Sequence, residues 1–153
     1  MTSAPDECLQ TLRAFLSYCF DGGADILTDA ASQDRWLTPA LKQQILDNER
    51  MAQDRRKQYP TDRIDSVSNK DFIGFWDLPT TFTILGSRHY GDQAVVDIEY
   101  TWSIGTEYEG DRELVSYSLK DDGKSWRVDD VFQLRGPYIP TGVCLSQRLR
   151  ERL

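Results

Sequence analysis

The sequence predicts an α+β fold in which N-terminal helices pack in a curved antiparallel sheet. Between Leu9 and Phe20, apolar residues recur every three or four positions, which is the period of a helix. From residue 94 onward they alternate with polar residues, which is the period of a strand with one buried face. The length of 153 residues is common for one domain. We therefore expect a single domain over 1–153, with helices at about 6–59, the sheet at about 80–134 and a tail at 135–153.

Three helices are expected in the first part of the chain. The first covers residues 6–20 and ends at Asp21-Gly22-Gly23, and a short second helix is expected over residues 24–31. The third begins cleanly at Thr38, an N-cap that is followed by Pro39 in the first turn. It has to end before Tyr59-Pro60, and residues 61–80 show no regular period.

The second half reads as a meander of strands. Phe82 and Ile84 indicate one strand, and residues 90–92 form a turn. In the next strand one set of side chains faces inward and Asp97 and Glu99 face outward; the inward set is Ala94, Val96, Ile98, Tyr100, Trp102 and Ile104.

Two further strands, residues 113–120 and 126–134, are joined by a hairpin loop with a glycine at a left-handed position. The tail then carries Leu145, Leu149 and Leu153 at four-residue spacing. We expect this stripe to fold back onto the chain's own sheet, which makes the protein a monomer or a weak homodimer.

Composition and charge exclude several classes of function. The net charge of −7 repels phosphate backbones, so nucleic acid is a poor partner. No apolar run is long enough to span a membrane. The first residues carry no export signal, so the sequence as written indicates a cytoplasmic protein, or a periplasmic or exported one if a signal has been removed. The three cysteines lack the spacing of a disulfide framework or a zinc site, and no metal or cofactor is expected.

The order of elements and three short segments resemble known proteins. Helices followed by a meander, with a last strand that reads Ser125-Trp126-Arg127-Val128-Asp129-Asp130-Val131-Phe132, resemble the nuclear transport factor 2-like superfamily over about residues 6–134. More narrowly, three segments look like a bacterial family of unknown function with many small lipoproteins: Trp36-Leu37-Thr38-Pro39-Ala40-Leu41, Asp71-Phe72 with Trp76-Asp77-Leu78-Pro79, and Trp126 to Val131. The resemblance implies a cystatin-like cone, in which the sheet wraps round the helices. It implies fold more than function, because the superfamily hosts isomerases, dehydratases, ligand carriers and toxin-neutralising immunity proteins.

An aromatic-lined hollow inside the cone is the first candidate site. Tyr100 and Trp102 face inward, and Trp36 and Trp76 are expected nearby. Such a hollow suits a small apolar molecule, although aromatic side chains at strand period also serve as plain core packing.

An acidic loop is the second candidate site. Glu107, Glu109, Asp111 and Glu113 stand between two strands beside one arginine, and their spacing lacks the calcium-loop pattern. This loop is either a solvated hairpin tip or an acidic rim that contacts a basic protein.

No set of nucleophile, base and orienting residue is apparent, and the one histidine, His89, stands beside a turn. The sequence therefore favours a non-catalytic binding domain, for a small apolar ligand in the cone or for a basic protein at the acidic rim. Two alternatives stay open: an immunity protein that neutralises a toxin, and a cofactor-free isomerase or dehydratase that uses the cone.

Overall fold

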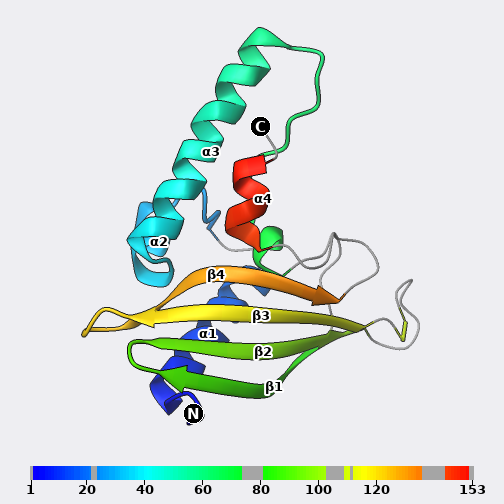
Figure 1. Ribbon diagram of the computed structural model, residues 1–153. Coiled ribbons are helices and arrows are strands. Elements are labelled where there is room, and N and C mark those ends of the chain that lie inside the picture. Colours follow the sequence, from blue (N-terminus) through cyan, green and yellow to red (C-terminus); the bar gives the residue numbers. More distant parts are fainter. Residues whose placement is uncertain are drawn as a thin grey trace.

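A computed structural model describes residues 2–21, 24–73, 81–102, 109–110, 112–135 and 144–151. In this part of the chain, four α-helices accompany a four-stranded antiparallel sheet in the order β1-β2-β3-β4 (Figure 1). The predicted α+β fold is thus confirmed. The elements are α1 Asp6–Phe20, α2 Ala30–Trp36, α3 Pro39–Gln58, the 3₁₀ helix η1 Asn69–Phe72, β1 Thr81–Tyr90, β2 Gln93–Thr101, β3 Arg112–Asp121, β4 Trp126–Arg135 and α4 Leu145–Glu151.

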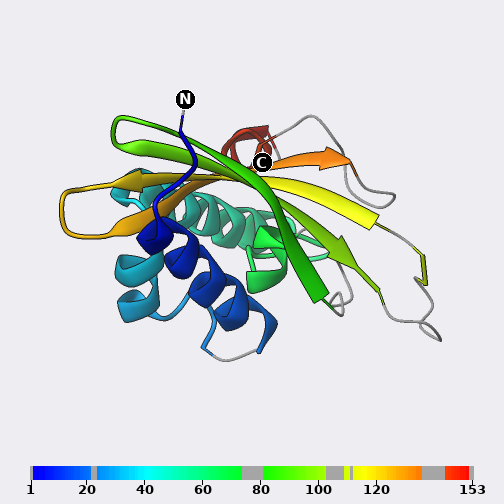
Figure 2. The ribbon, with the colours of Figure 1, turned by 90° about the horizontal axis from the view of Figure 1, so that it is seen from below.

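Helix α1 fills the concave face of the sheet. Its apolar stripe, which includes Leu12, Phe15 and Leu16, is fully buried in one core with the inward side chains of the strands. Asp6 and Glu7 in its first turn complement the positive end of the helix dipole. Figure 2 shows the strands curving over α1, and because β1 and β4 remain separate edges, the sheet is curled but not closed.

The second helix begins later than the sequence predicts. Residues 26–28 form a turn, in which Asp25 accepts hydrogen bonds from the backbone N–H groups of Leu27 (3.0 Å, to the carboxylate) and Thr28 (3.0 Å, to the carbonyl). Such local bonds to aspartate compete with helix formation. Helix α2 therefore starts at Ala30, and the prediction of a helix over 24–31 is wrong.

Helix α3 begins as predicted. The Thr38 hydroxyl accepts a hydrogen bond from the Leu41 N–H at 3.3 Å, and Pro39 lies in the first turn. The helix then projects past the β4 edge of the sheet (Figure 1). Near its end the Arg56 guanidinium donates to the Ile64 carbonyl at 3.0 Å and to the Ser66 hydroxyl at 2.6 Å, which holds the returning chain against the helix.

The alternation in β2 predicts its two faces correctly. Ala94, Val96, Ile98 and Tyr100 are buried, and the residues between them, among them Asp97 and Glu99, are partly exposed. We call the face that carries the buried set the inner face, because α1 covers it. Strand β1 has a bulge between Ile84 and Gly86, and Ile104 lies outside the described residues.

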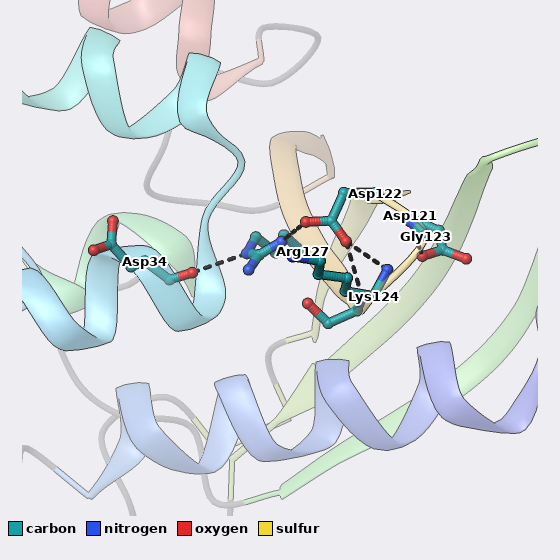
Figure 3. A network of polar contacts seen from close by, with 7 residues as sticks. Asp34, Asp121, Asp122, Gly123, Lys124 and Arg127 are labelled. Atoms are coloured by element: carbon teal, nitrogen blue, oxygen red, sulfur yellow. Dashed lines mark hydrogen bonds and ion pairs between the residues drawn. The ribbon is translucent and has the colours of Figure 1, made fainter.

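The β3–β4 hairpin is tied to α2 at its tip. The Asp122 carboxylate accepts the backbone N–H groups of Lys124 and Ser125, both at 2.9 Å, and also pairs with the Arg127 guanidinium. Arg127 Nε in turn donates to the Asp34 carbonyl at 2.8 Å (Figure 3). Hydrogen bonds from the backbone N–H groups of Ser125 and Lys124, with a smaller effect of the Arg127 guanidinium, lower the pKa of Asp122 to about 2.

The tail folds back onto the chain, as predicted. Leu145 and Leu149 of α4 are buried against α3 and β4. The Asp130 carboxylate accepts the Ser146 N–H at 3.0 Å and the Ser146 hydroxyl at 2.5 Å. At the other end of α4, the Asn48 amide donates to the Leu149 carbonyl at 2.8 Å. Leu153 lies outside the described residues.

Candidate functional site

Four buried polar side chains gather on the inner face of the sheet. Tyr100 of β2 pairs directly with Glu113 of β3, and Tyr117 of β3 lies on the same face two positions beyond Val115. Gln133 of β4 pairs with Val115, so it is a diagonal neighbour of Glu113. We call Tyr100, Glu113, Tyr117 and Gln133 the buried polar cluster.

The two tyrosines of the cluster form a hydrogen-bonded chain. Tyr117 donates its hydroxyl proton to the Phe72 carbonyl at 2.5 Å, and the Tyr100 hydroxyl contacts that of Tyr117. Burial raises the pKa of both hydroxyls well above the ordinary tyrosine value, so both keep their protons at neutral pH. These two hydrogen bonds anchor η1 to the inner face of the sheet.

Glu113 and Gln133 are the unusual members of the cluster. Glu113 is 0% exposed and Gln133 is 2% exposed. Within the described residues, the two carboxyl oxygens of Glu113 and the amide nitrogen of Gln133 have no hydrogen-bond partner. Burial raises the pKa of Glu113 to about 8, so this carboxyl is mostly protonated at neutral pH.

An aromatic group flanks the cluster. The rings of Phe20 and Phe82 stack with centroids 5.8 Å apart and planes 8° apart. Both rings meet Tyr100 edge-on, at 5.9 Å from Phe20 and 6.3 Å from Phe82. Phe20 and Phe82 are only partly buried, so this group carries apolar surface from the solvent toward Glu113.

The predicted aromatic hollow is only partly assembled. Tyr100 and Trp102 are buried on β2 and just beyond its end. Trp36 is buried in a different aromatic group, with Phe15 at 6.0 Å and Tyr18 at 6.2 Å between ring centroids. Trp76 lies outside the described residues.

The prediction for Glu113 as part of an exposed acidic loop is wrong. Its side chain is fully buried because β3 begins at Arg112, and strand alternation then places Glu113 on the same face as Val115 and Tyr117. Glu109 lies in an exposed turn, as the loop interpretation requires. Glu107 and Asp111 fall outside the described residues.

Sequence reasoning missed Gln133, Tyr117, Phe20 and Phe82. The signal for Glu113 and Tyr117 was present, since residues 113, 115, 117 and 119 share one face of a strand. Gln133 gave no such signal, because a shift in the β3–β4 register between Ser118 and Leu119 changes the alternation along β4 and so decides which way Gln133 faces.

His89 lies far along the sheet from this cluster. It pairs with Ala94, whereas Tyr100 pairs with Phe82 nearer the other end of the same hairpin. Its Nε2 atom contacts the Gly91 carbonyl at 2.8 Å, and its ring lies 5.7 Å from that of Trp126. These contacts give it a place in the fold and keep it away from the buried polar cluster.

The outer face of the sheet carries an open pocket of about 420 Å³. The carboxylates on this face already have protein donors: Asp97 accepts from Ser116, Asp129 from Thr38 at 2.8 Å, and Asp130 from Ser146. The pocket is lined by Arg88, Val95, Ser116, Ser118, Asp129, Asp130, Phe132 and Cys144. Its acidic groups are thus held by the fold itself, in contrast to Glu113.

Two classes of site are not found in the part of the chain that the structure describes. No group of three or more histidine, cysteine or acidic side chains is placed to hold a metal ion. No helix there combines the length and the apolar character needed to cross a bilayer.

Comparison of the chain with protein-family models, with curated proteins and with solved structures gave no match.

Proposed function

We propose that this protein is a binding domain for a small, mainly apolar molecule that is seated against the inner face of the sheet. The observation that supports this most is the pair of buried polar groups without hydrogen-bond partners in the described residues, Glu113 and Gln133. A buried polar group without a partner costs about 1–3 kcal/mol. A bound molecule that supplies the missing hydrogen bonds would recover that free energy.

The apolar character of the ligand follows from what surrounds these groups. Phe20, Phe82 and Tyr100 form a continuous set of ring contacts. Stacked and edge-on aromatic rings of this kind favour an apolar, planar body, and a few polar groups among them fix its orientation.

A second candidate function is an acid–base enzyme of the isomerase or dehydratase type. Burial brings the pKa of Glu113 to about 8, close to the value that suits a general acid or base at neutral pH. A basic protein partner is the weaker candidate, because Glu113 contributes nothing to an acidic rim from its buried position.

Binding is tested by titrating the protein with 2-methoxynaphthalene, an apolar probe that carries no proton donor, and recording backbone amide shifts by NMR. We expect the shifts to gather at Glu113, Tyr117 and Gln133. The amides of Lys120 and Arg127 serve as reference positions. No shift up to the solubility limit, or shifts at the outer face alone, would contradict the proposal.

Two neighbouring substitutions on β1 provide a matched pair. Phe82→Ala removes a ring of the aromatic group and should weaken probe binding about fivefold or more. Thr83→Ala alters an exposed side chain on the opposite face and should leave the affinity unchanged. Circular dichroism of both variants checks that the fold is retained.

The variant Glu113→Gln distinguishes an enzyme from a protein that only binds its ligand. This change keeps the shape of the side chain and removes its titratable proton. If the protein is an enzyme, turnover of its substrate would fall by two or more orders of magnitude while the substrate still binds.

A further inference from the structure

The Phe72 carbonyl fixes which group donates in the two hydrogen bonds that link Tyr100, Tyr117 and Phe72. The Phe72 carbonyl only accepts, so the proton in the 2.5 Å contact belongs to Tyr117. Tyr117 has no second proton, and the contact between the two hydroxyls therefore requires Tyr100 to donate. The Tyr100 oxygen is left as an acceptor only.

Glu113, opposite Tyr100, and Gln133, diagonal to Glu113, complete a mixed set of donors and acceptors. The protonated Glu113 carboxyl offers one O–H donor and one carbonyl acceptor, and the Gln133 amide nitrogen offers donors. Both side chains are buried and have these groups unpartnered within the described residues. A fitting ligand thus has to donate toward Tyr100 or Glu113 and accept from Gln133 or Glu113.

A hydroxyl group meets both requirements with a single oxygen. A ketone or ether accepts but cannot donate, so it would leave the Tyr100 oxygen and the Glu113 carbonyl oxygen without a donor. An ammonium group donates but cannot accept, and it would need Glu113 ionised in a fully buried position, where unpaired or imperfectly paired charge is costly.

We infer that the ligand is an alcohol or phenol, an apolar molecule whose hydroxyl group donates to Tyr100 Oη or Glu113 and accepts from Gln133 or Glu113. The inference rests on the proposed binding function and adds the chemical class of the ligand. Its apolar body would lie along Phe20 and Phe82, which contact Tyr100.

The test compares three probes on one bicyclic body at about pH 6: 2-naphthol, 2-methoxynaphthalene and the cation of 2-naphthylmethylamine. Isothermal titration calorimetry gives the affinities, and amide shifts of Glu113 and Tyr117 confirm the location. We expect 2-naphthol to bind about tenfold more tightly than the methyl ether, the effect of one buried acceptor left unpaired.

Tyr117→Phe sharpens the comparison because it removes the acceptor that takes the Tyr100 proton. Tyr100 then regains a free proton, and the preference for 2-naphthol over the ether should fall toward one. Thr101→Ala, on the opposite face of β2, should leave the tenfold ratio unchanged. If Tyr117→Phe fails to fold, the ratio on the unmodified protein still decides.

Each outcome has a defined meaning. Equal affinity for 2-naphthol and its ether, or tightest binding of the cation, would overturn the assignment of a hydroxyl ligand while leaving the binding function in place. Binding of none of the three probes at the inner face would overturn the binding function and this inference with it.

Discussion

Tyr100 and Glu113 face each other across the β2–β3 ladder, and both side chains are completely buried. The hydroxyl proton of Tyr100 is directed to Tyr117, so it is not available to Glu113. Burial without a hydrogen-bond donor keeps the carboxyl protonated in the folded protein at a pH where the unfolded chain ionises it. This relationship links the candidate site to the pH dependence of stability.

The first prediction concerns that pH dependence. Burial raises the pKa of Glu113 from 4.5 to about 8, so the folded state holds a proton that the unfolded chain releases above about pH 4.5. The stability that comes from this raised pKa is fully present below that pH and is lost as the pH rises to about 8. At about 1.4 kcal/mol per pKa unit, the loss approaches about 5 kcal/mol as an upper limit. The variant Glu113→Gln has no titratable carboxyl group at this position. Its free energy of unfolding should therefore rise by several kcal/mol relative to that of the parent between pH 5 and pH 8.

Urea unfolding of both proteins at several pH values measures this difference. The titratable groups near Glu113 are Tyr100 and Tyr117, and Cys19 lies near these two tyrosines. Burial raises the pKa values of all three, so they keep their protons in this range. Glu99→Gln, on the partly exposed outer face of β2, is the matched control for exchanging a glutamate for a glutamine. A stability difference between Glu113→Gln and the parent that stays constant with pH would show that Glu113 is not buried.

The second prediction compares neighbouring residues on opposite faces of β2. Ile98 is fully buried, so Ile98→Ala should lower the free energy of unfolding by about 2–5 kcal/mol. Asp97 accepts a hydrogen bond from Ser116 and lies 3.6 Å from Arg88, and both contacts are on the outer face. Asp97→Ala should cost about 1 kcal/mol or less. Thermal melts in which both variants lose equal stability would reverse the assignment of the faces.

The fold could be predicted from the sequence wherever one local signal decided it. The Thr38-Pro39 cap marked the start of α3, and the alternation from Ala94 to Tyr100 marked the buried face of β2. The start of α2 was predicted wrongly for two reasons. Hydrogen bonds to Asp25 compete with helix formation, and several polar side chains in this segment are of types that cap helices equally well, so the sequence does not single out one start.

The candidate site was harder to predict because it depends on pairing between strands. In the sequence, Glu113 stands at the end of an acidic segment. Only its pairing with Tyr100 in the sheet shows that its side chain faces inward. Gln133 depends on a register shift that the sequence does not display. The direction of the tyrosine chain depends on the Phe72 carbonyl, a backbone group brought in from η1.

The third prediction concerns the β3–β4 hairpin. Gly123 has φ +90, a left-handed conformation that strains any residue with a Cβ atom. Gly123→Ala should destabilise the protein by about 1 kcal/mol, even though nothing lies within 4 Å of the added atom. Gly86→Ala is the matched control, because Gly86 also has open space and lacks a positive φ, so it should be neutral or slightly stabilising. Equal effects in denaturant melts would contradict the strain argument.

The fourth prediction concerns the attachment of α4 to the sheet. The Asp130 carboxylate accepts both the backbone N–H and the hydroxyl of Ser146 at the start of α4. Asp130→Ala should lower the free energy of unfolding by about 1–3 kcal/mol, the range for hydrogen bonds to a charged group. Asp47→Ala breaks an exposed ion pair with Arg50 and an exposed hydrogen bond from the Gln43 amide, and should cost less than about 1 kcal/mol. Faster hydrogen exchange confined to α4 in Asp130→Ala would locate the effect, and protection equal to the parent's would contradict it.

The fifth prediction concerns whether the tail serves folding or assembly. Leu145 and Leu149 are buried against α3 and β4 of the same chain, and the Leu149 carbonyl accepts from Asn48. A chain that ends at Tyr138 loses both leucines and leaves the Asn48 amide without this acceptor, so it should be about 2–5 kcal/mol less stable. Because those contacts are intramolecular, light scattering should give the same monomeric or weakly dimeric state for the full chain and the shortened one. A tight dimer that dissociates on truncation would show instead that α4 holds two copies together.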